Sequence, residues 1–161
     1  MVDKLSLNLG CGERTYKEYP DGYKCINYDE RNLPNVDQVG DVKKLPFPNE
    51  YFHYILASDI IEHFPISMTA GLIKEWSRVL VRGGVMEIRT PNFKWAVEHY
   101  IKNRDAKFVS FHIFGGQDYP GNFHYVIFDR FWLKNGMLRN GFKEVSYEEE
   151  GSNFIMKVEK V

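Results

Sequence analysis

The stretch KLSLNLGCGERT, residues 4–15, carries the pattern that decides the fold class. Apolar and polar residues alternate up to Leu9, and two glycines, Gly10 and Gly12, then flank a single residue. Such an alternation followed by glycines predicts a short strand that ends in a turn. In α/β sheets the loop after the first strand is a usual seat for a ligand, because glycines let the backbone approach it closely.

Further strand and helix patterns follow along the chain. Short apolar runs predict strands at residues 24–28, 38–42, 52–57 and 85–89, and a final pair at 143–149 and 154–159. Apolar residues at three- and four-residue spacing predict a helix over 67–80, stopped by Gly83-Gly84. A second helix is expected to reach about residue 103, and a third to begin at an Asp129 N-cap and end near Asn140-Gly141. This alternation predicts an α/β fold with a doubly wound sheet, closed by an antiparallel C-terminal hairpin.

Residues 105–128 lack any clean period. They contain three glycines, one proline and six phenylalanines or tyrosines before Val126. Long connections inside compact domains are usually functional or disordered, and this one is too aromatic for disorder. We therefore expect an ordered, aromatic insertion in a single domain that spans residues 1–161.

Composition excludes several classes of protein. The 21 basic and 22 acidic residues are spread along the chain, so no basic arm for nucleic acid is expected. No apolar stretch approaches the roughly 20 residues that span a bilayer, and the N-terminus lacks a secretory pattern. We expect a cytoplasmic protein with no membrane insertion. Its two cysteines are too few for a disulfide framework and lack zinc-motif spacing.

The glycine loop favours a cofactor without phosphate. A dinucleotide fingerprint would place a third glycine where Thr15 stands, and Pro20 leaves little room for the helix that would receive a pyrophosphate. A nicotinamide-dependent oxidoreductase is therefore the less favoured alternative. At the end of the second expected strand, the Asp29 carboxylate can accept hydrogen bonds from a ribose diol. Asp41, with the Val42 amide beside it, follows the third strand and can reach an adenine.

Five segments together carry a resemblance to a known family. LNLGCG, NYD, GDVKKLPF, FHYILASDIIEHF and WSRVLVRGGV, in this order and at these spacings, resemble the class I S-adenosylmethionine-dependent methyltransferases, specifically the small bacterial type. The resemblance covers about residues 5–92 by motif. It implies a Rossmann-like seven-stranded mixed sheet with the order 3-2-1-4-5-7-6, and methyl transfer from S-adenosylmethionine.

The resemblance also implies residue roles. The cofactor site would be formed by Asn8, Gly10, Cys11, Gly12, Asp29, Asp41, Val42, Ser58 and Asp59. Glu62 and His63, which match the family's E-H pair, would border the same cleft on the substrate side. The chain departs from the family at Asn8, where an acidic residue is usual, and in its shortened first helix. These departures leave open a second alternative, a cofactor-binding module without turnover.

The insertion supplies the candidate catalytic groups. A hydroxyl acceptor gains from a general base, and we expect His124 to be that base, with His112 and Asp118 as further candidates. Gln117 and Asn122 offer polar contacts to a polyol, and Tyr119 an aromatic face.

The segment from His112 to His124 also resembles a run in small bacterial relatives associated with cell-surface saccharide genes. The resemblance implies a saccharide or other small-molecule acceptor, most simply a hydroxyl. Self-association of the chain is a further expectation. A metal site of His112, Asp118 and His124 has irregular spacing, and we expect no metal.

Overall fold

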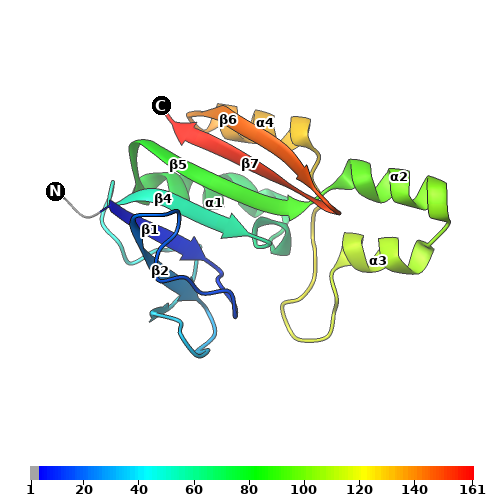
Figure 1. Ribbon diagram of the computed structural model, residues 1–161, viewed down its shortest axis with the longest axis horizontal. Coiled ribbons are helices and arrows are strands. Elements are labelled where there is room, and N and C mark those ends of the chain that lie inside the picture. The colour runs from blue at the N-terminus through cyan, green and yellow to red at the C-terminus, as the bar shows by residue number, and fades with distance from the viewer. Residues whose placement is uncertain (1–3) are drawn as a thin grey trace.

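The computed structural model describes residues 4–161 and is built on one seven-stranded sheet (Figure 1). The strands are β1 (Lys4–Leu9), β2 (Tyr23–Asp29), β3 (Gln38–Val39), β4 (Phe52–Ser58), β5 (Leu80–Pro91), β6 (Phe142–Glu150) and β7 (Asn153–Lys160). Their order is β3-β2-β1-β4-β5-β7-β6. The pairs from β3 to β5 are parallel, whereas β7 runs antiparallel to both β5 and β6. The expected fold class, strand order and C-terminal hairpin are confirmed.

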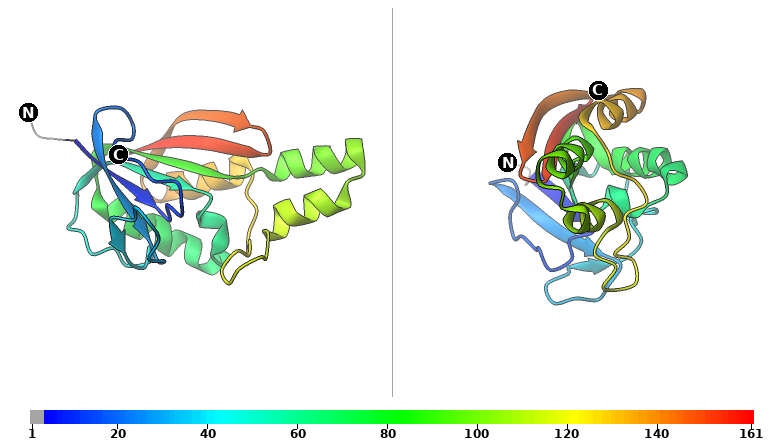
Figure 2. Two further views of the ribbon diagram at one scale, coloured as in Figure 1. Left: turned by 60° about the horizontal axis from the view of Figure 1, so that its bottom comes forward. Right: turned by 90° about the vertical axis from the view of Figure 1, so that its right-hand side faces the viewer.

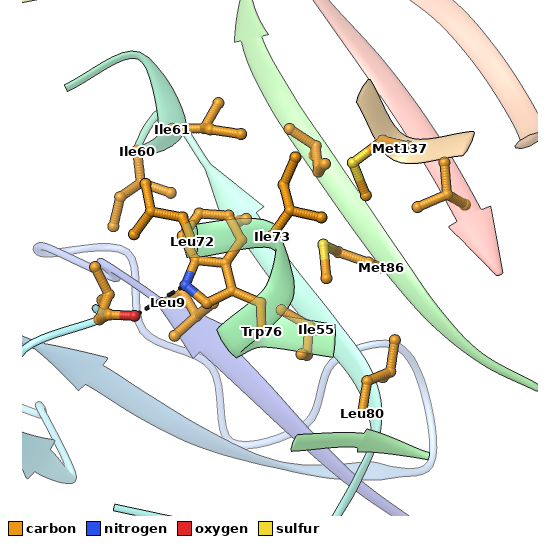
Figure 3. Close-up of a cluster of buried hydrophobic side chains, with 14 of the residues drawn as sticks. Leu9, Ile55, Ile60, Ile61, Leu72, Ile73, Trp76, Leu80, Met86 and Met137 are labelled. Atoms are coloured by element: carbon orange, nitrogen blue, oxygen red, sulfur yellow. Dashed lines mark hydrogen bonds between the residues drawn. The ribbon is translucent and has the colours of Figure 1, made fainter. Parts of the chain in front are cut away.

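Helices α1 (Ile66–Val79) and α4 (Arg130–Arg139) lie on the same face of the sheet (Figure 2). Trp76 from α1, Met137 from α4 and Met86 from β5 belong to a single buried cluster, in which each is at most 1% exposed (Figure 3). Truncating a buried tryptophan typically costs about 3–5 kcal/mol. The Trp76 indole Nε1 also donates a hydrogen bond of 3.0 Å to the carbonyl of Val42. The core thereby holds in place a loop residue that the resemblance assigns to the cofactor.

On the opposite face of the sheet, the loop of residues 10–22 packs over part of β4 and β5 where a helix would otherwise lie. The rings of Tyr16 and Tyr19 lie 4.9 Å apart, and Tyr19 also packs edge-on against Tyr54 of β4. The Tyr19 hydroxyl donates a hydrogen bond of 2.8 Å to Glu87 of β5. The shortened first helix that the sequence indicates is therefore replaced by an aromatic loop.

Several boundaries differ from the expected ones. The third strand ends at Val39, not at residue 42, and the first long helix covers Ile66–Val79, one residue ahead of the expected range at both ends. Gly83 and Gly84 do not follow the helix as a stop signal but lie inside β5, which begins at Leu80. The pairing with β4 explains this. Phe52 and Tyr54 are two residues apart on β4, but their partners on β5, Leu80 and Val85, are five residues apart. The extra residues of β5 bulge outwards at the glycines, where Gly83 adopts a φ of +73°.

The insertion contains a helix that the sequence does not reveal. Helices α2 (Phe93–Asn103) and α3 (Ala106–Phe114) form a hairpin that projects beyond the sheet (Figure 1). Asp105 caps α3 by accepting a hydrogen bond of 3.0 Å from the Phe108 amide. Apolar residues occur on all sides of this helix and form no single stripe, and Phe108, Phe111 and Phe114 are all about half exposed. This is why periodicity fails to find it.

The other expected helix signals hold. The Asp129 carboxylate accepts a hydrogen bond of 2.7 Å from the Trp132 amide at the start of α4, which confirms the N-cap. A short 3-10 helix, η1 (Ile61–His63), follows β4. Within residues 4–161, no helix has the length and apolar character needed to cross a membrane.

Candidate functional site

Two adjoining clefts lie at the carboxyl ends of β1, β2 and β4. The first has a volume of about 490 Å³ and is bordered by the glycine loop, Ser58 and Tyr119. The second has a volume of about 260 Å³ and is bordered by Asp29, Val42 and His63, among others. Gly10, Arg31, Asp59 and Tyr119 line both. The first volume is within the range of roughly 300–1,000 Å³ that is typical of small-molecule sites, and the location is the usual one for this sheet.

The glycine loop is shaped by close packing under the clefts. Gly10 has a φ of +59°, and a Cβ at this position would lie 2.1 Å from Cδ1 of Ile60. Gly12 has a φ of +53°. Cys11 between them points into the protein and is 5% exposed, and burial together with the nearby Asp29 raises the pKa of its thiol to about 11. Both glycines are therefore required by the backbone, and Cys11 is a neutral packing residue.

Asn8 anchors the loop from below. Its side-chain Nδ2 donates to the carbonyl of Arg14 at 2.7 Å and to Asn27 Oδ1 at 3.1 Å. Asn27 in turn bonds both the amide and the carbonyl of Tyr16. An aspartate has no donor for these two contacts, so the departure from the family pattern at Asn8 matches a loop that has no helix to order it.

Asp29 lies at the end of β2 and is 3% exposed. Its Oδ2 accepts a hydrogen bond of 2.8 Å from the Gly12 amide, and its Oδ1 accepts from the amide and Nε of Arg31. Although burial opposes ionisation, these hydrogen bonds and the Arg31 charge lower the pKa of Asp29 below its ordinary value. The carboxylate is thus ionised beside the glycine loop.

Asp41 and Val42 border the second cleft. Asp41 is exposed and accepts a hydrogen bond of 2.9 Å from the Lys43 amide. Val42 is 6% exposed, and its carbonyl is held by Trp76. The structure therefore brings Asp29, Asp41 and Gly10 to the edge of one cleft.

Ser58 and Asp59 end β4 at the point where the two clefts meet. Asp59 has a φ of +52°, an uncommon backbone conformation for a residue other than glycine. Its carboxylate accepts hydrogen bonds from Ser58, Arg89 and Asn153. These contacts hold the Asp59 charge in a fixed position beside both clefts.

Glu62 is fully buried directly behind this point. Its Oε2 accepts a hydrogen bond of 3.1 Å from the Thr90 hydroxyl, and its Oε1 has no hydrogen-bond partner. Burial, reinforced by the Asp59 charge, raises the pKa of Glu62 to about 8. A buried carboxyl with one unpartnered oxygen is uncommon outside functional sites.

His63 and His124 meet beside Glu62, although they come from distant parts of the chain. Their ring centroids lie 4.9 Å apart, and one ligand atom from each of Glu62, His63 and His124 lies within 4.8 Å of the others. His63 Nδ1 lies 3.0 Å from the Phe123 carbonyl, and His124 Nδ1 lies 3.1 Å from the His112 carbonyl. Burial lowers the pKa of both histidines, which favours neutral imidazoles near pH 7. His63 borders the second cleft.

The remaining residues of the insertion have different surroundings. Tyr119 lines both clefts, and the Arg31 guanidinium lies 5.2 Å from its ring centroid. Gln117, Asp118 and Asn122 form a turn, in which the Asn122 side chain donates to Asp118 and the Gln117 amide donates to the Asn122 carbonyl. These three residues do not border either cleft.

His112 lies at the base of this segment on α3. Its ring lies 5.3 Å from that of Trp95, and its Nε2 is buried without a partner. Its carbonyl positions His124. It borders neither cleft.

Sequence reasoning missed Arg31, Thr90 and Tyr125. Arg31 covers Asp29 and lines both clefts, Thr90 bonds Glu62, and Tyr125 borders the second cleft. Arg31 stands two residues after the acidic strand end, which is a signal that could have found it. Thr90 and Tyr125 are brought to the site by the pairing of β4 with β5 and by the return of the insertion, and no local pattern marks either residue.

Comparison with known proteins gives one family match. The model of the family described as "Methyltransferase domain" matches residues 7–88. This range contains the glycine loop, Asp29, Asp41 and the Glu62-His63 pair. No curated protein sequence shows significant similarity to the chain.

Solved structures of methyltransferases share the fold over nearly the whole chain. A SAM-dependent methyltransferase from Methanosarcina mazei is 16% identical with a TM-score of 0.73, over 99% of this chain and 93% of that one. One from Archaeoglobus fulgidus is 15% identical with a TM-score of 0.71, over 98% and 86%. The 1,6-didemethyltoxoflavin-N1-methyltransferase of Burkholderia thailandensis, solved with 1,6-didemethyltoxoflavin and S-adenosylhomocysteine bound, is 13% identical with a TM-score of 0.68, over 97% and 70%.

Proposed function

Because the chain belongs to the methyltransferase domain family, we propose that this S-adenosylmethionine-dependent enzyme methylates a hydroxyl group of a small molecule or saccharide. One observation carries the proposal. The glycine loop and the acidic residues Asp29 and Asp41 border adjoining clefts, beside a group of neutral histidines that can serve an acceptor.

The clefts fit S-adenosylmethionine chemically. The cofactor has no phosphate but carries a ribose diol, an adenine and a positively charged sulfur. Asp29 is ionised beside the glycine loop, Asp41 borders the other end of the site, and Asp59 holds a negative charge where the clefts meet. Asn8, Cys11, Gly12 and Ser58 border the first cleft, where we place the methionine part of the cofactor.

S-adenosylmethionine supplies an electrophilic methyl group, and transfer requires an acceptor held in line with it. Tyr119 lines both clefts and offers an aromatic face to an acceptor ring. Arg31 fixes the Tyr119 ring from one side. We assign Tyr119 to acceptor positioning on this ground.

Activation of the hydroxyl is assigned to the group of Glu62, His63 and His124. A hydroxyl must lose its proton as it attacks, and a neutral imidazole can take that proton. His124 borders neither cleft and lies behind His63, but it remains the proposed base, because its Nδ1 faces the His112 carbonyl and its other ring nitrogen is then free to accept. His63 reaches the second cleft from the same group.

The other residues expected from the sequence receive supporting roles. His112 holds the His124 ring through its carbonyl. Gly115 and Gly116 allow the turn of Gln117, Asp118 and Asn122, because a Cβ at either glycine would lie under 3.0 Å from an Asn122 atom. We propose that this turn positions Tyr119 and His124, with the polar side chains of Gln117 and Asn122 at its exposed rim.

Self-association remains a proposal of its own. Helices α2 and α3 expose Ile101, Phe108, Phe111 and Phe114, each close to half exposed or more. Contiguous apolar side chains on a projecting element commonly mark contact surfaces. Analytical ultracentrifugation over a range of concentrations would show whether the chain is a monomer.

Calorimetry with the purified protein tests cofactor binding. Wild-type protein should bind S-adenosylmethionine and S-adenosylhomocysteine saturably, and Asp29→Ala should lose about 1–3 kcal/mol of binding free energy. Asp21→Ala is the control. It removes an exposed carboxylate from the loop between β1 and β2, and this variant should bind the cofactor like the wild type. Absence of binding by folded wild-type protein at millimolar cofactor would contradict the proposal.

The acceptor class is tested separately with a methyl-labelled cofactor. A panel of sugars, nucleotide sugars and small alcohols is compared with a matched panel of amines. Label in the hydroxyl panel, resistant to conditions that cleave esters, supports an ether product. Label found only in amines would refute the hydroxyl assignment while leaving methyl transfer intact.

A further inference from the structure

The group of Glu62, His63 and His124 has the composition of a metal site. Each residue offers one ligand atom, and the three atoms lie within 4.8 Å of one another. Two of the residues come from η1 and the third from the insertion. We propose that these three side chains bind one divalent transition-metal ion, which the sequence pattern does not predict.

The unpartnered oxygen of Glu62 points to a missing positive group. The side chain is fully buried, Oε2 bonds Thr90, and Oε1 has no hydrogen-bond partner among the described residues. Leaving a carboxylate oxygen unpaired in the interior is costly. Neither histidine forms a hydrogen bond with that oxygen, although one ligand atom of each histidine lies within 4.8 Å of a carboxyl oxygen of Glu62. The two imidazole rings pack edge to face and neither hydrogen-bonds Oε1, so one ligand atom from each of the three residues is available to a shared ion.

The two histidines are oriented as metal ligands usually are. His63 Nδ1 faces the Phe123 carbonyl and His124 Nδ1 faces the His112 carbonyl. A proton on Nδ1 leaves the lone pair of Nε2 available, and metal-binding histidines typically donate their second ring nitrogen to a carbonyl in this way. The Glu62 carboxylate has its own supporting partner in Thr90. All three proposed ligands therefore have a second contact that holds them.

The surrounding charges favour a cation. Asp59 lies close enough to raise the pKa of Glu62, and its carboxylate accepts hydrogen bonds from Arg89 and Asn153. Because those contacts occupy its oxygens, Asp59 contributes charge and is not counted among the ligands. Arg89 acts on Glu62 in the opposite direction, but it is itself paired with Asp59 and Glu150.

The donor set selects the type of ion. Two imidazoles and one carboxylate suit Zn²⁺, Co²⁺, Fe²⁺ or Mn²⁺, whereas Mg²⁺ and Ca²⁺ prefer oxygen donors. Three protein ligands leave at least one coordination position for another molecule, as in catalytic zinc sites. Because His63 borders the second cleft, we expect that position to be accessible from the cleft.

The metal site would also have a role in the proposed function, namely activation of the acceptor hydroxyl. Only this consequence rests on the proposed function. With the free ring nitrogen of His124 bound to the ion, the ion would replace that residue as the activating group: it would lower the pKa of a coordinated acceptor hydroxyl, whose proton would pass to solvent. The metal-binding proposal itself does not require methyl transfer. The two can therefore be tested apart.

The test uses untagged full-length protein freed of metal with a chelator. Calorimetry with Zn²⁺ and Co²⁺ should show one ion bound per chain, and Co²⁺ should develop visible absorption bands typical of nitrogen and oxygen ligands. Mg²⁺ should bind far more weakly. Glu62→Gln and His124→Ala should each lower Zn²⁺ affinity by at least about 100-fold. His99→Ala, which removes a histidine of α2 outside the group, is the matched control and should bind like the wild type.

Folding and cofactor binding are followed in the same samples. Circular dichroism reports folding, and if the buried Glu62→Gln variant fails to fold, the half-buried His63→Gln decides the outcome. Folded wild-type protein that binds no Zn²⁺ or Co²⁺ would overturn the proposal, as would unchanged affinity in His63→Gln and His124→Ala. If folded wild-type protein binds S-adenosylhomocysteine but no metal, the metal site alone is refuted. If folded wild-type protein binds no cofactor, the proposed function is refuted.

Discussion

The Tyr125 amide donates a hydrogen bond of 2.8 Å to the Glu62 carbonyl and ties the insertion to the turn after β4. His124, one residue before Tyr125, and His63, one residue after Glu62, complete the link, because their rings lie 4.9 Å apart and His63 Nδ1 faces the Phe123 carbonyl. A segment of about twenty-five residues is thereby fastened over the carboxyl ends of the strands. The clefts, the histidines and Glu62 depend on that contact for their arrangement.

Gly10→Ala should destabilise the protein and weaken cofactor binding. A left-handed conformation costs a residue with a Cβ about 1–2 kcal/mol, and the clash with Ile60 should add about 1–3 kcal/mol. Gly22→Ala is the matched control, because its φ is +80° but nothing lies within 4 Å of the added Cβ. Denaturant unfolding should give Gly10→Ala a lower free energy of unfolding than Gly22→Ala. Ile60→Ala, added to Gly10→Ala, should restore part of the difference. Equal losses in the two single variants would contradict the packing account.

Asn8→Asp restores the acidic residue that the family resemblance leads one to expect, yet it should destabilise this chain. The variant loses the donor to Arg14 and places a carboxylate against Asn27 Oδ1, at a cost of about 1–3 kcal/mol. Asn32→Asp, at an exposed position, is the control for added charge. Unfolding and S-adenosylhomocysteine titrations measure both effects. Increased stability in Asn8→Asp would show that the loop is not held by this network.

Glu62 should make the metal-free protein less stable as pH rises from about 4.5 to about 8. Its pKa is raised to about 8 in the folded state, mainly by burial and next by Asp59, with Arg89 acting in the opposite direction. The folded state therefore holds a proton that the unfolded chain has released in this window, which lowers the free energy of unfolding as pH increases. The penalty should be on the order of a few kcal/mol and should level off above pH 8.

The pKa values of the buried histidines set the pH range in which the effect of Glu62 on stability can be measured by itself. Burial lowers the pKa of His63, His112 and His124, so their contribution is lost as pH falls below about 6.5 and is constant above it. Between pH 6.5 and 8 the slope should come chiefly from Glu62. Unfolding measured at several pH values should show this slope in the wild type and its loss in Glu62→Gln. An identical slope in the two proteins would refute the assignment.

Tyr119→Ala should raise the KM for the acceptor more than it changes cofactor affinity. The ring is the proposed aromatic face for the acceptor, and losing an aromatic contact of about 0.5–1.5 kcal/mol changes an equilibrium by roughly two- to twelve-fold. Tyr119→Phe should behave like the wild type, because the ring remains. Tyr100→Ala removes a comparable ring, which pairs with Arg104 on α2, and should leave KM unchanged. Steady-state kinetics with the acceptor found above measures these values, and a wild-type KM in Tyr119→Ala would remove Tyr119 from the acceptor site.

Much of the fold was predictable because its signals are local. Alternation up to Leu9, the continuous apolar run of β4 and the Asp129 cap each act within a few residues of sequence. The errors arise where pairing across the sheet overrides the local signal. Gly83-Gly84 is a plausible helix stop, but the pairing of β5 with β4 draws both glycines into a strand. Helix α3 was hidden because it lacks the apolar stripe that periodicity detects.

The candidate site was predictable only in part, for the same reason. Residues that follow strand ends, such as Asp29 and Ser58, are recognisable because parallel strands bring their carboxyl ends to one edge. The histidines and acids of the insertion offered many combinations, and sequence order favoured His112, Asp118 and His124. The structure instead brings His124 to Glu62 and His63, about sixty residues away, and turns Asp118 toward Asn122.

The sequence by itself indicated the strands, the glycine loop and the acidic residues at the strand ends, because these follow from periodicity, backbone conformation and motif spacing, and its resemblance to the methyltransferase family implied the strand order. Only the tertiary structure decided which side chains meet above the sheet. The path of residues 115–129 back to the sheet decides whether a Glu62 oxygen lacks a hydrogen-bond partner. It also decides whether two imidazoles lie near Glu62. That path is set by many weak long-range contacts, and no short pattern in the chain encodes it.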